Sequence, residues 1–563
     1  MNRPHRGPVS IVGLSGVYNL TKENLGGMKL KKIIWLGIYF LASVGLYLLL
    51  AWRYPIMPSL ENPRASWATI VEPTLGNAVL HILIYLGLTL LYLTIIRLLI
   101  SLQGEAASHS GWGISLIVGA WLICSGVLMT VAPAGESHDI FDYTFRGRMM
   151  MEYDDNPLVD VPDSYPLSTP YSRYLAWRKH VDTYGPIWEA SSATIANGVR
   201  QVASRLGWWN DDYPVCPKSP ESCRLLVVYV TGYRLLAIAL TGISGWLIFS
   251  IVKRSQPSLA PLALAIWLLN PLTLIATALG GHNDAIMLVL VLLCWWLLQR
   301  QHMYLALLAL ILAAHVKLTA LIWLPVCALW ILWCWGWART LKLGLASAVS
   351  GLALSWMLYA PFEGWGSLPR MLQERSEFLA NSLWRILNYL LIYQWKWSTT
   401  NARQLSVNLA NWLFAISALF LILWMFNFRP KRWRNKATIT PEEAQQTLWR
   451  ALQAVIMLYL LVGSFWFQHW YILWILAPAA LLPEGRLARA LLPWLAFGAL
   501  SSNVAMDFLL NTTLKDSKSI VKYILPVVMI WGPILFAILL SKLTHLWEVK
   551  KARQTASKLI VQN

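Results

Sequence analysis

Long apolar runs recur along this 563-residue chain and constrain its fold more than any other feature. A transmembrane helix needs about 20 apolar residues, because the hydrocarbon core of a bilayer is about 30 Å thick. Runs of that length follow one another from residue 33 to residue 545. Only 13% of the residues are charged, whereas soluble proteins carry about 25%. Because helices satisfy their backbone hydrogen bonds internally, the sequence predicts an all-α polytopic membrane protein.

About fourteen spans are expected in a single membrane domain. Their predicted ranges are 33–52, 77–100, 112–131, 224–251, 259–278, 284–299, 303–316, 318–336, 340–360, 403–427, 449–467, 470–483, 488–508 and 520–545. The polar segments between and before them are 1–32, 132–222, 362–400 and 428–447. No signal-peptide cleavage site follows the first run, which indicates a retained span. Met1 and Met28 both remain open as the start, since either keeps the basic cluster Lys29–Lys32.

Lysine and arginine predict the orientation, because short cytoplasmic loops carry an excess of both. With segment 1–32 in the cytoplasm, the basic clusters of the short loops and the tail all fall inside. They are Lys253–Arg254, Arg339–Lys342, Arg429–Lys436 (in the cytoplasmic loop 428–447), Arg486–Arg489 and Lys550–Arg553. Both termini are then cytoplasmic, loops 132–222 and 362–400 are external, and we expect a plasma-membrane protein. The formal charge of +19 follows from such loops and from contact with anionic lipids. No basic helix or RNA-type motif indicates a nucleic-acid partner.

The external loop 132–222 carries the densest set of charged residues, in GESHDIFDYTFRGRMMMEYDDNPLVDVP. Asp139 and Asp142 are followed by Arg146 and Arg148. Paired carboxylates beside paired arginines at a membrane surface suit chemistry on a phosphorylated substrate. The alternative for a single loop aspartate is solvation or a helix cap. Residues 188–209 have a helical pattern typical of an interfacial helix, and a fifteenth span here would invert the topology downstream.

Other polar residues are expected to emerge on the same face of the membrane. They are His282, Asn283, Asp284, Lys317, Glu363 and the aromatic run Phe465–Tyr471. Ionisable groups at membrane depth are costly, so they usually mark function or pair with one another. Alternatives are a helix cap for Asp284, snorkelling for Lys317 and an interfacial belt for the aromatic run. Their clustering at one rim favours a site at the outer membrane surface over a transport path, which needs polar residues through the middle.

The six cysteines fall into two groups. Four lie in apolar spans, where a cysteine is normally a small buried hydrophobic residue. Cys216 and Cys223 lie in the external loop as CPKSPESC, which is compatible with a local disulfide, but sequence does not supply their geometry. No CxxC or HExxH pattern indicates a zinc site.

An ordered set of segments resembles the GT-C superfamily of integral-membrane glycosyltransferases, most closely the polyprenyl-phosphate-mannose-dependent α-mannosyltransferases. These segments are SHDIFDYTFRGRMM (137–150), DNPLVDVP (155–162), TYGPIWE (183–189), NPLTLIATALGGHNDAIM (270–287), AAHVKLTALIWLPV (313–326), YAPFEGWGSL (359–368) and FQHWYILWILAPAAL (467–481). They occur in the same order as in the family. His138 stands where arginine is more usual, and His469 where proline is more usual.

The resemblance implies an enzyme that moves a sugar, with mannose as the implied sugar, from a polyprenyl-phosphate donor to a glycan or glycolipid hydroxyl. Asp139 takes the place of the general base, with Asp142 beside it. The implied donor-phosphate ligands are Arg146, Arg148, His282, Lys317 and His469. The implied sugar- or lipid-binding residues are Tyr184, Asn283, Asp284, Trp470 and Tyr471. The product would belong to the cell-envelope glycans.

No cofactor is expected to be required, since the external cations suffice to compensate the phosphate charge. A divalent cation would have Asp139, Asp142 and Asp284 as its only plausible ligands in the sequence. Two other functions remain open: a lipid-linked sugar flippase or transporter, for which the expected repeat between halves is not evident, and an O-antigen-ligase-like transferase, which lacks the GHND and QHWY segments. Acceptor, linkage and oligomeric state are not indicated.

Overall fold

The computed structural model describes residues 14–561 except 103–110, 134, 210–215, 217, 427–439, 516 and 518. Over these residues the chain is built of helices, and it has two isolated bridges but no strand. The prediction of an all-α polytopic protein is therefore confirmed. The basic cluster Arg429–Lys436 lies outside the described residues, and for segment 1–30 and the tail Lys550–Arg553 no side chain is described.

Every predicted span overlaps a helix or a bent pair of helices. These helices are α1 (Leu14–Arg53), α3 (Leu75–Leu102), α4 (Gly111–Leu128), α7 (Pro220–Ser255), α8 (Ala260–Leu268), α9 (Pro271–Leu274), α10 (Asp284–Gln299), α11 (Met303–Ala314), α12 (Leu324–Trp335), α13 (Trp337–Tyr359), α16 (Thr399–Met425), α18 (Pro441–Leu458), α19 (Leu473–Ala480), α20 (Leu492–Asn511) and α21 (Val521–Val561). In the described part, eight helices are long and apolar enough to cross a membrane, or nine with one bent pair. The expected number of fourteen is therefore not confirmed.

Part of the difference in number comes from short helices at the centre of the bundle. All the residues of α19, and all those of α8 except Pro261, are buried, so neighbouring helices rather than lipid surround them. Asn270 and Pro271 break α8 from α9 with a bend of 53°. Proline has no N–H to donate, and the Asn270 side chain accepts a hydrogen bond from Leu272 N at the start of α9. Such breaks are tolerated at membrane depth only where protein buries them.

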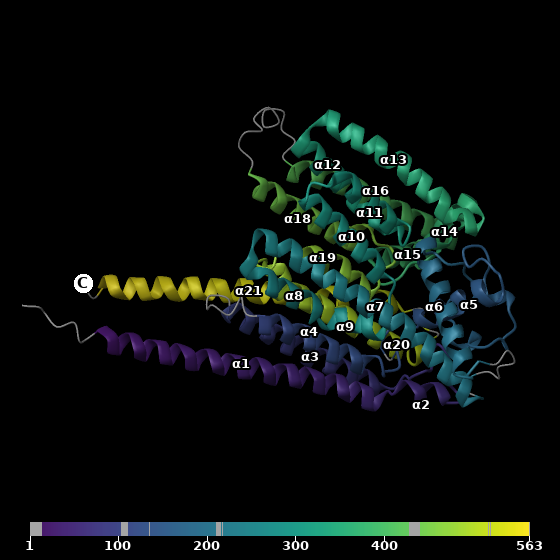
Figure 1. The fold of residues 1–563 in the computed structure, drawn as a ribbon, viewed down its shortest axis with the longest axis horizontal. Helices are drawn as coiled ribbons and strands as arrows, with labels where there is room; N and C mark the ends of the chain where they lie inside the picture. Colours follow the sequence, from purple (N-terminus) through teal and green to yellow (C-terminus); the bar gives the residue numbers. More distant parts are fainter. Residues whose placement is uncertain are drawn as a thin grey trace, which may run out of the picture.

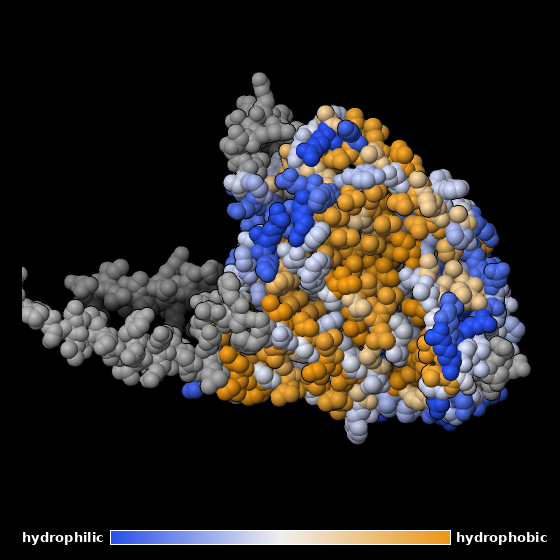
Figure 2. Space-filling model, in the orientation of Figure 1, coloured by the Kyte–Doolittle hydropathy of each residue, from blue (hydrophilic) through white to orange (hydrophobic). Residues whose placement is uncertain are grey.

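Long helices form the outside of the bundle, and their outward faces are apolar. Leu41, Trp356, Phe420 and Phe536, on α1, α13, α16 and α21, are each more than half exposed. Figure 2 shows a broad apolar band across the middle of the molecule, with hydrophilic residues towards both ends. An exposed apolar band of this size is typical of a surface that contacts lipid.

Short helices and loops gather at one end of the bundle, at the right of Figure 1. They include α2 (Ile56–Glu61), α5 (Asp139–Glu152), α6 (Pro186–Arg205), α14 (Ser367–Glu377) and α15 (Leu383–Tyr393). Helix α6 lies where the sequence predicts a helix in residues 188–209, and it is not among the eight long apolar helices of the described chain. The N-terminus of α1 and the C-terminus of α21 extend from the opposite end of the bundle.

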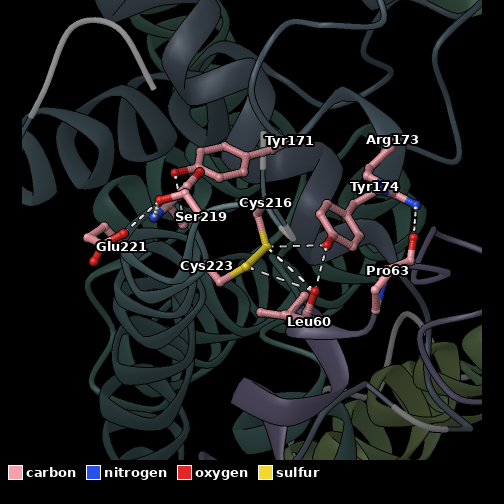
Figure 3. Close-up of a disulfide and its surroundings, with 10 residues drawn as sticks. Leu60, Pro63, Tyr171, Arg173, Tyr174, Cys216, Ser219, Glu221 and Cys223 are labelled. Carbon is pink, nitrogen blue, oxygen red and sulfur yellow. Dashed lines mark hydrogen bonds between the residues drawn. A yellow bond between two sulfur atoms is a disulfide. The ribbon is translucent and has the colours of Figure 1, made fainter. Parts of the chain in front are cut away.

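Cys216 and Cys223 form a disulfide with a Cα–Cα distance of 5.0 Å, which resolves the pairing that the sequence left open. Both are buried. The Tyr174 hydroxyl donates to the Leu60 carbonyl oxygen at 3.1 Å and lies 3.4 Å from Cys216 Sγ (Figure 3). The bond thus joins the end of segment 132–222 to the start of α7, beside α2. The other four cysteines lie in apolar helices.

Replacing both Cys216 and Cys223 by serine is expected to lower the free energy of unfolding by about 2–3 kcal/mol, because a short closed loop is released in the unfolded chain. Thermal unfolding in detergent measures the effect. Dithiothreitol should bring the wild type to the melting temperature of the double variant and leave the variant unchanged. Equal melting temperatures for the oxidised wild type and the variant would contradict the expectation.

Candidate active site

A cavity of about 340 Å³ opens at the loop-rich end of the bundle. Its walls come from six parts of the chain: Trp67, the start of α5, the loop before α6, the α14–α15 region, the aromatic run before α19, and α20. The polar and aromatic residues that line it include Glu136, His138, Asp139, Asp142, Arg146, Trp177, Tyr184, Arg375, Asn381, Arg385, Gln468, Trp470, Tyr471 and Asn503. Parts of both polar segments predicted to be external therefore meet at one site.

Asp139 is the carboxylate with the freer oxygen. It is the first residue of α5, where the helix dipole favours negative charge. Its Oδ1 accepts a hydrogen bond from Trp177 Nε1 at 2.9 Å. Its Oδ2 has no hydrogen-bond partner among the described residues. One oxygen is thus oriented by a neighbour, and the other is available to a molecule in the cavity.

Asp142 lies one turn further along α5 and has both oxygens occupied. They accept hydrogen bonds from the backbone N–H groups of Ala176 and Trp177, each at 3.1 Å. Burial raises the pKa of Asp142 to about 7, and the Asp139 charge adds to this while Arg146 and the two N–H groups oppose it. The carboxyl of Asp142 therefore holds the 176–177 loop over α5, which positions Trp177 against Asp139.

The two arginines of α5 point in different directions, because residues two apart lie on different sides of a helix. Arg146 lines the cavity, donates to the His180 carbonyl oxygen at 2.9 Å and lies 3.5 Å from Asp182 Oδ2. Arg148 is paired with Glu152 and donates to the Pro170 carbonyl oxygen at 3.1 Å. It is not among the lining residues, so the structure places it away from the cavity.

His282 and His469, expected near a phosphate, instead converge on a carboxylate. Glu136 Oε1 lies 3.1 Å from His282 Nε2 and 2.5 Å from His469 Nε2, and all three residues are buried. Burial alone would raise the pKa of Glu136, but the two imidazoles lower it to about 2. His282 also stacks on Trp470, with ring centroids 3.8 Å apart. Glu136 and Trp470 line the cavity, and the two histidines stand behind them.

Lys317 and Asp284 form a buried ion pair. Lys317 Nζ lies 3.0 Å from both Asp284 oxygens, and Trp474 Nε1 donates to Oδ1 at 2.5 Å. The ammonium group also lies 5.1 Å and 5.0 Å from the ring centroids of Tyr184 and Tyr471. The pair therefore stands behind an aromatic wall of the cavity. Asn283, which precedes Asp284 in the sequence, is also buried. Its side-chain nitrogen and oxygen have no hydrogen-bond partner in the described chain.

The cavity contains cations that the sequence motifs do not indicate. Arg375 on α14 donates to the Tyr471 hydroxyl at 2.7 Å, and Arg385 on α15 donates to the Leu379 carbonyl oxygen at 3.1 Å. His138 lines the cavity as well. Both arginines lie in segment 362–400, which was predicted to be external. The sequence could have indicated them only as arginines of a segment predicted to lie on the same face of the membrane as Asp139.

A second cavity, of about 450 Å³, lies at the opposite end of the bundle. Its walls include the end of α7, at Arg254, and the start of α18, at Thr440 and Glu442. It is the larger of the two, but its described lining residues include no paired carboxylates beside clustered cations. The chemistry described above belongs to the smaller cavity.

A family model described as alpha-(1->6)-mannopyranosyltransferase, N-terminal domain, of the MptA_B family, matches residues 34–333. No curated protein matches the chain. The matched region is more than half of the chain, and it includes Asp139, the turn before α10 and Lys317. The chain therefore belongs to the MptA_B family of GT-C-type, polyprenyl-phosphate-mannose-dependent mannosyltransferases, and it is a mannosyltransferase embedded in a membrane.

Proposed function

We propose that this enzyme transfers mannose from a polyprenyl-phosphate donor to a glycan or glycolipid hydroxyl, with Asp139 as general base. The observation that carries the proposal is the cavity itself. In it, a carboxylate with a free oxygen shares a space of about 340 Å³ with the guanidinium groups of Arg146, Arg375 and Arg385. A base and a cluster of cations are the two parts that transfer from a lipid phosphate requires.

In the proposed reaction, the acceptor hydroxyl gives its proton to Asp139 Oδ2 as its oxygen attacks the anomeric carbon of the sugar. The bond from that carbon to the phosphate oxygen breaks, and polyprenyl phosphate leaves with the electron pair. General-base assistance typically contributes about 100- to 10,000-fold to such a step. The Trp177 indole N–H would keep the Asp139 carboxylate oriented throughout.

Negative charge on the departing phosphate needs preorganised donors in a site with little water. Arg375 and Arg385 are suited to it, because a guanidinium group can contact phosphate through two parallel N–H donors. Arg146 has fewer free donors, since backbone carbonyl oxygens already occupy it. The aromatic side chains of Tyr184, Trp470 and Tyr471 would face the sugar, and Asn381, Gln468 and Asn503 offer hydrogen bonds to its hydroxyls.

The proposed location is the outer face of the plasma membrane, with both termini in the cytoplasm. Support comes from the ends of the bundle: the basic clusters near Arg254, Arg339 and Arg486 belong to the end opposite the cavity. The positive-inside rule then assigns that end to the cytoplasm. The donor lipid chain would lie along the outer helices, with its phosphate at the cavity.

Purified protein in detergent, given a panel of polyprenyl-phosphate sugars and a candidate acceptor mixture, tests the donor directly. Mass spectrometry is expected to show a product one hexose heavier with polyprenyl-phosphate mannose, and none with a nucleotide-linked mannose alone. Transfer from the nucleotide sugar in the absence of lipid would contradict the proposal. Movement of the intact lipid-linked sugar across proteoliposomes without any glycosylated product would favour a flippase instead.

Arg375→Ala is expected to weaken donor binding about 10- to 100-fold, because a hydrogen bond to a charged group contributes about 1.5–3 kcal/mol. Donor titration of the initial transfer rate measures it as a rise in KM. Arg370→Ala is a matched control, since Arg370 is an exposed residue of the same helix. Equal KM values for both variants and the wild type would remove Arg375 from the donor site.

A further inference from the structure

We infer that Glu136, His282 and His469 bind one divalent transition-metal ion, for which zinc is the best match. The three residues come from distant parts of the chain: the segment after α4, the turn before α10, and the turn before α19. Their ligand atoms, one from each side chain, all lie within 4.8 Å of one another.

The separations within the group suit a shared ion. Both imidazole Nε2 atoms point at the same carboxylate oxygen, at 3.1 Å and 2.5 Å. Three ligands at about 2.0–2.2 Å from a zinc ion lie roughly 3–3.5 Å apart in a tetrahedral arrangement. A small outward movement of His469 would therefore reach that geometry. Stacking on Trp470 fixes the plane of the His282 ring.

The chemistry of the ligands selects the kind of metal. Imidazole nitrogen suits zinc and other late first-row metals, whereas magnesium and calcium prefer all-oxygen ligands. The sequence suggested other ligands for a divalent cation, namely Asp139, Asp142 and Asp284. The structure does not bring these three carboxylates together around one point. Asp284 is paired with Lys317, and Asp142 is held by two backbone N–H groups.

Burial adds a second, independent observation. The side chains of Glu136 and His282 are 0% exposed and that of His469 is 1% exposed. Glu136 Oε2 has no hydrogen-bond partner in the described part of the chain. Burying polar atoms without partners is costly. A bound ion would supply a partner for Glu136 Oε2 through bidentate coordination, and it would compensate the carboxylate charge.

The position of the group indicates what the ion would do. Glu136 lines the cavity three residues before Asp139. With two imidazole nitrogens and the two oxygens of Glu136 as donors, a zinc ion that expands to five-coordination keeps one position open. The ion would tie together three segments of the cavity wall and place positive charge beside the substrate. The second effect rests on the proposed function, but metal binding itself does not.

The metal content of full-length protein, purified without a histidine tag, tests the inference. Elemental analysis after incubation with zinc and desalting is expected to give about one ion per chain. His282→Asn and His469→Asn should each weaken zinc binding by more than the roughly 10- to 100-fold caused by losing a second-shell partner. His302→Asn is the control, because His302 is an exposed histidine outside the group.

Two readouts keep the test independent of transfer activity and of variant folding. Cobalt substituted into the chelator-treated wild type should give the visible absorption of a four- or five-coordinate site, and zinc should raise the wild-type melting temperature. Less than about 0.1 zinc per wild-type chain, against the one expected for such a site, would overturn the inference. So would unchanged zinc content in both His282→Asn and His469→Asn.

Discussion

Replacing Asp139 by asparagine is expected to lower the rate of transfer about 100- to 10,000-fold, because the amide cannot take the acceptor proton. The amide oxygen can still accept the Trp177 N–H, so the loop over α5 should stay in place. Donor affinity should therefore change little. Single-turnover rates with saturating donor, together with a donor-binding assay, separate the two effects.

Asp163→Asn is the matched control for this prediction. Asp163 belongs to the same loop region, and its side chain is 46% exposed and paired with Arg178 at the surface. Surface substitutions of this kind usually change stability by less than about 0.5 kcal/mol. If Asp139→Asn turned over at the rate of Asp163→Asn, another group would have to be the base.

Replacing Lys317 by alanine is expected to lower the free energy of unfolding by about 3–5 kcal/mol, because it leaves Asp284 buried without its counter-charge. Asp284 is 0% exposed, and its remaining hydrogen bond comes from Trp474. The combination Asp284→Asn with Lys317→Met removes both charges and should recover most of the loss. Thermal unfolding in detergent compares the three proteins.

Lys342→Ala provides the control, since Lys342 is exposed on α13. The experiment also decides between two roles for Lys317. If the single variant kept the wild-type melting temperature and lost only donor affinity, Lys317 would contact the phosphate directly. The ion-pair role that the structure favours would then be wrong.

The sequence carries enough information to predict the architecture, because an apolar run of sufficient length has few alternatives to a helix in a membrane. The sequence does not indicate how many of the apolar runs form helices long enough to cross the membrane. The runs that became α8, α10, α11 and α19 are apolar like the others, yet they form short helices, some at the centre of the bundle. Whether an apolar helix faces lipid or protein depends on its neighbours, and hydropathy does not report them.

The candidate site was predictable as a location and less so as a set of contacts. Asp139 and Tyr471 do meet at one cavity, because polar residues at one rim can only gather there. Which charge faces which is decided by side-chain packing. That is why Lys317 is paired with Asp284 and why Arg148 is turned away from the cavity. Glu136 gives no local signal beyond its closeness to Asp139 in the sequence.

A structure with a non-transferable donor analogue, such as a polyprenyl-linked mannosyl phosphonate, tests the central claim most directly. The account predicts the phosphonate within hydrogen-bond distance, about 3 Å, of the Arg375 guanidinium, and the anomeric carbon on the Asp139 side of the same cavity. A headgroup bound at the opposite end of the bundle, near Arg254 and Thr440, would contradict it.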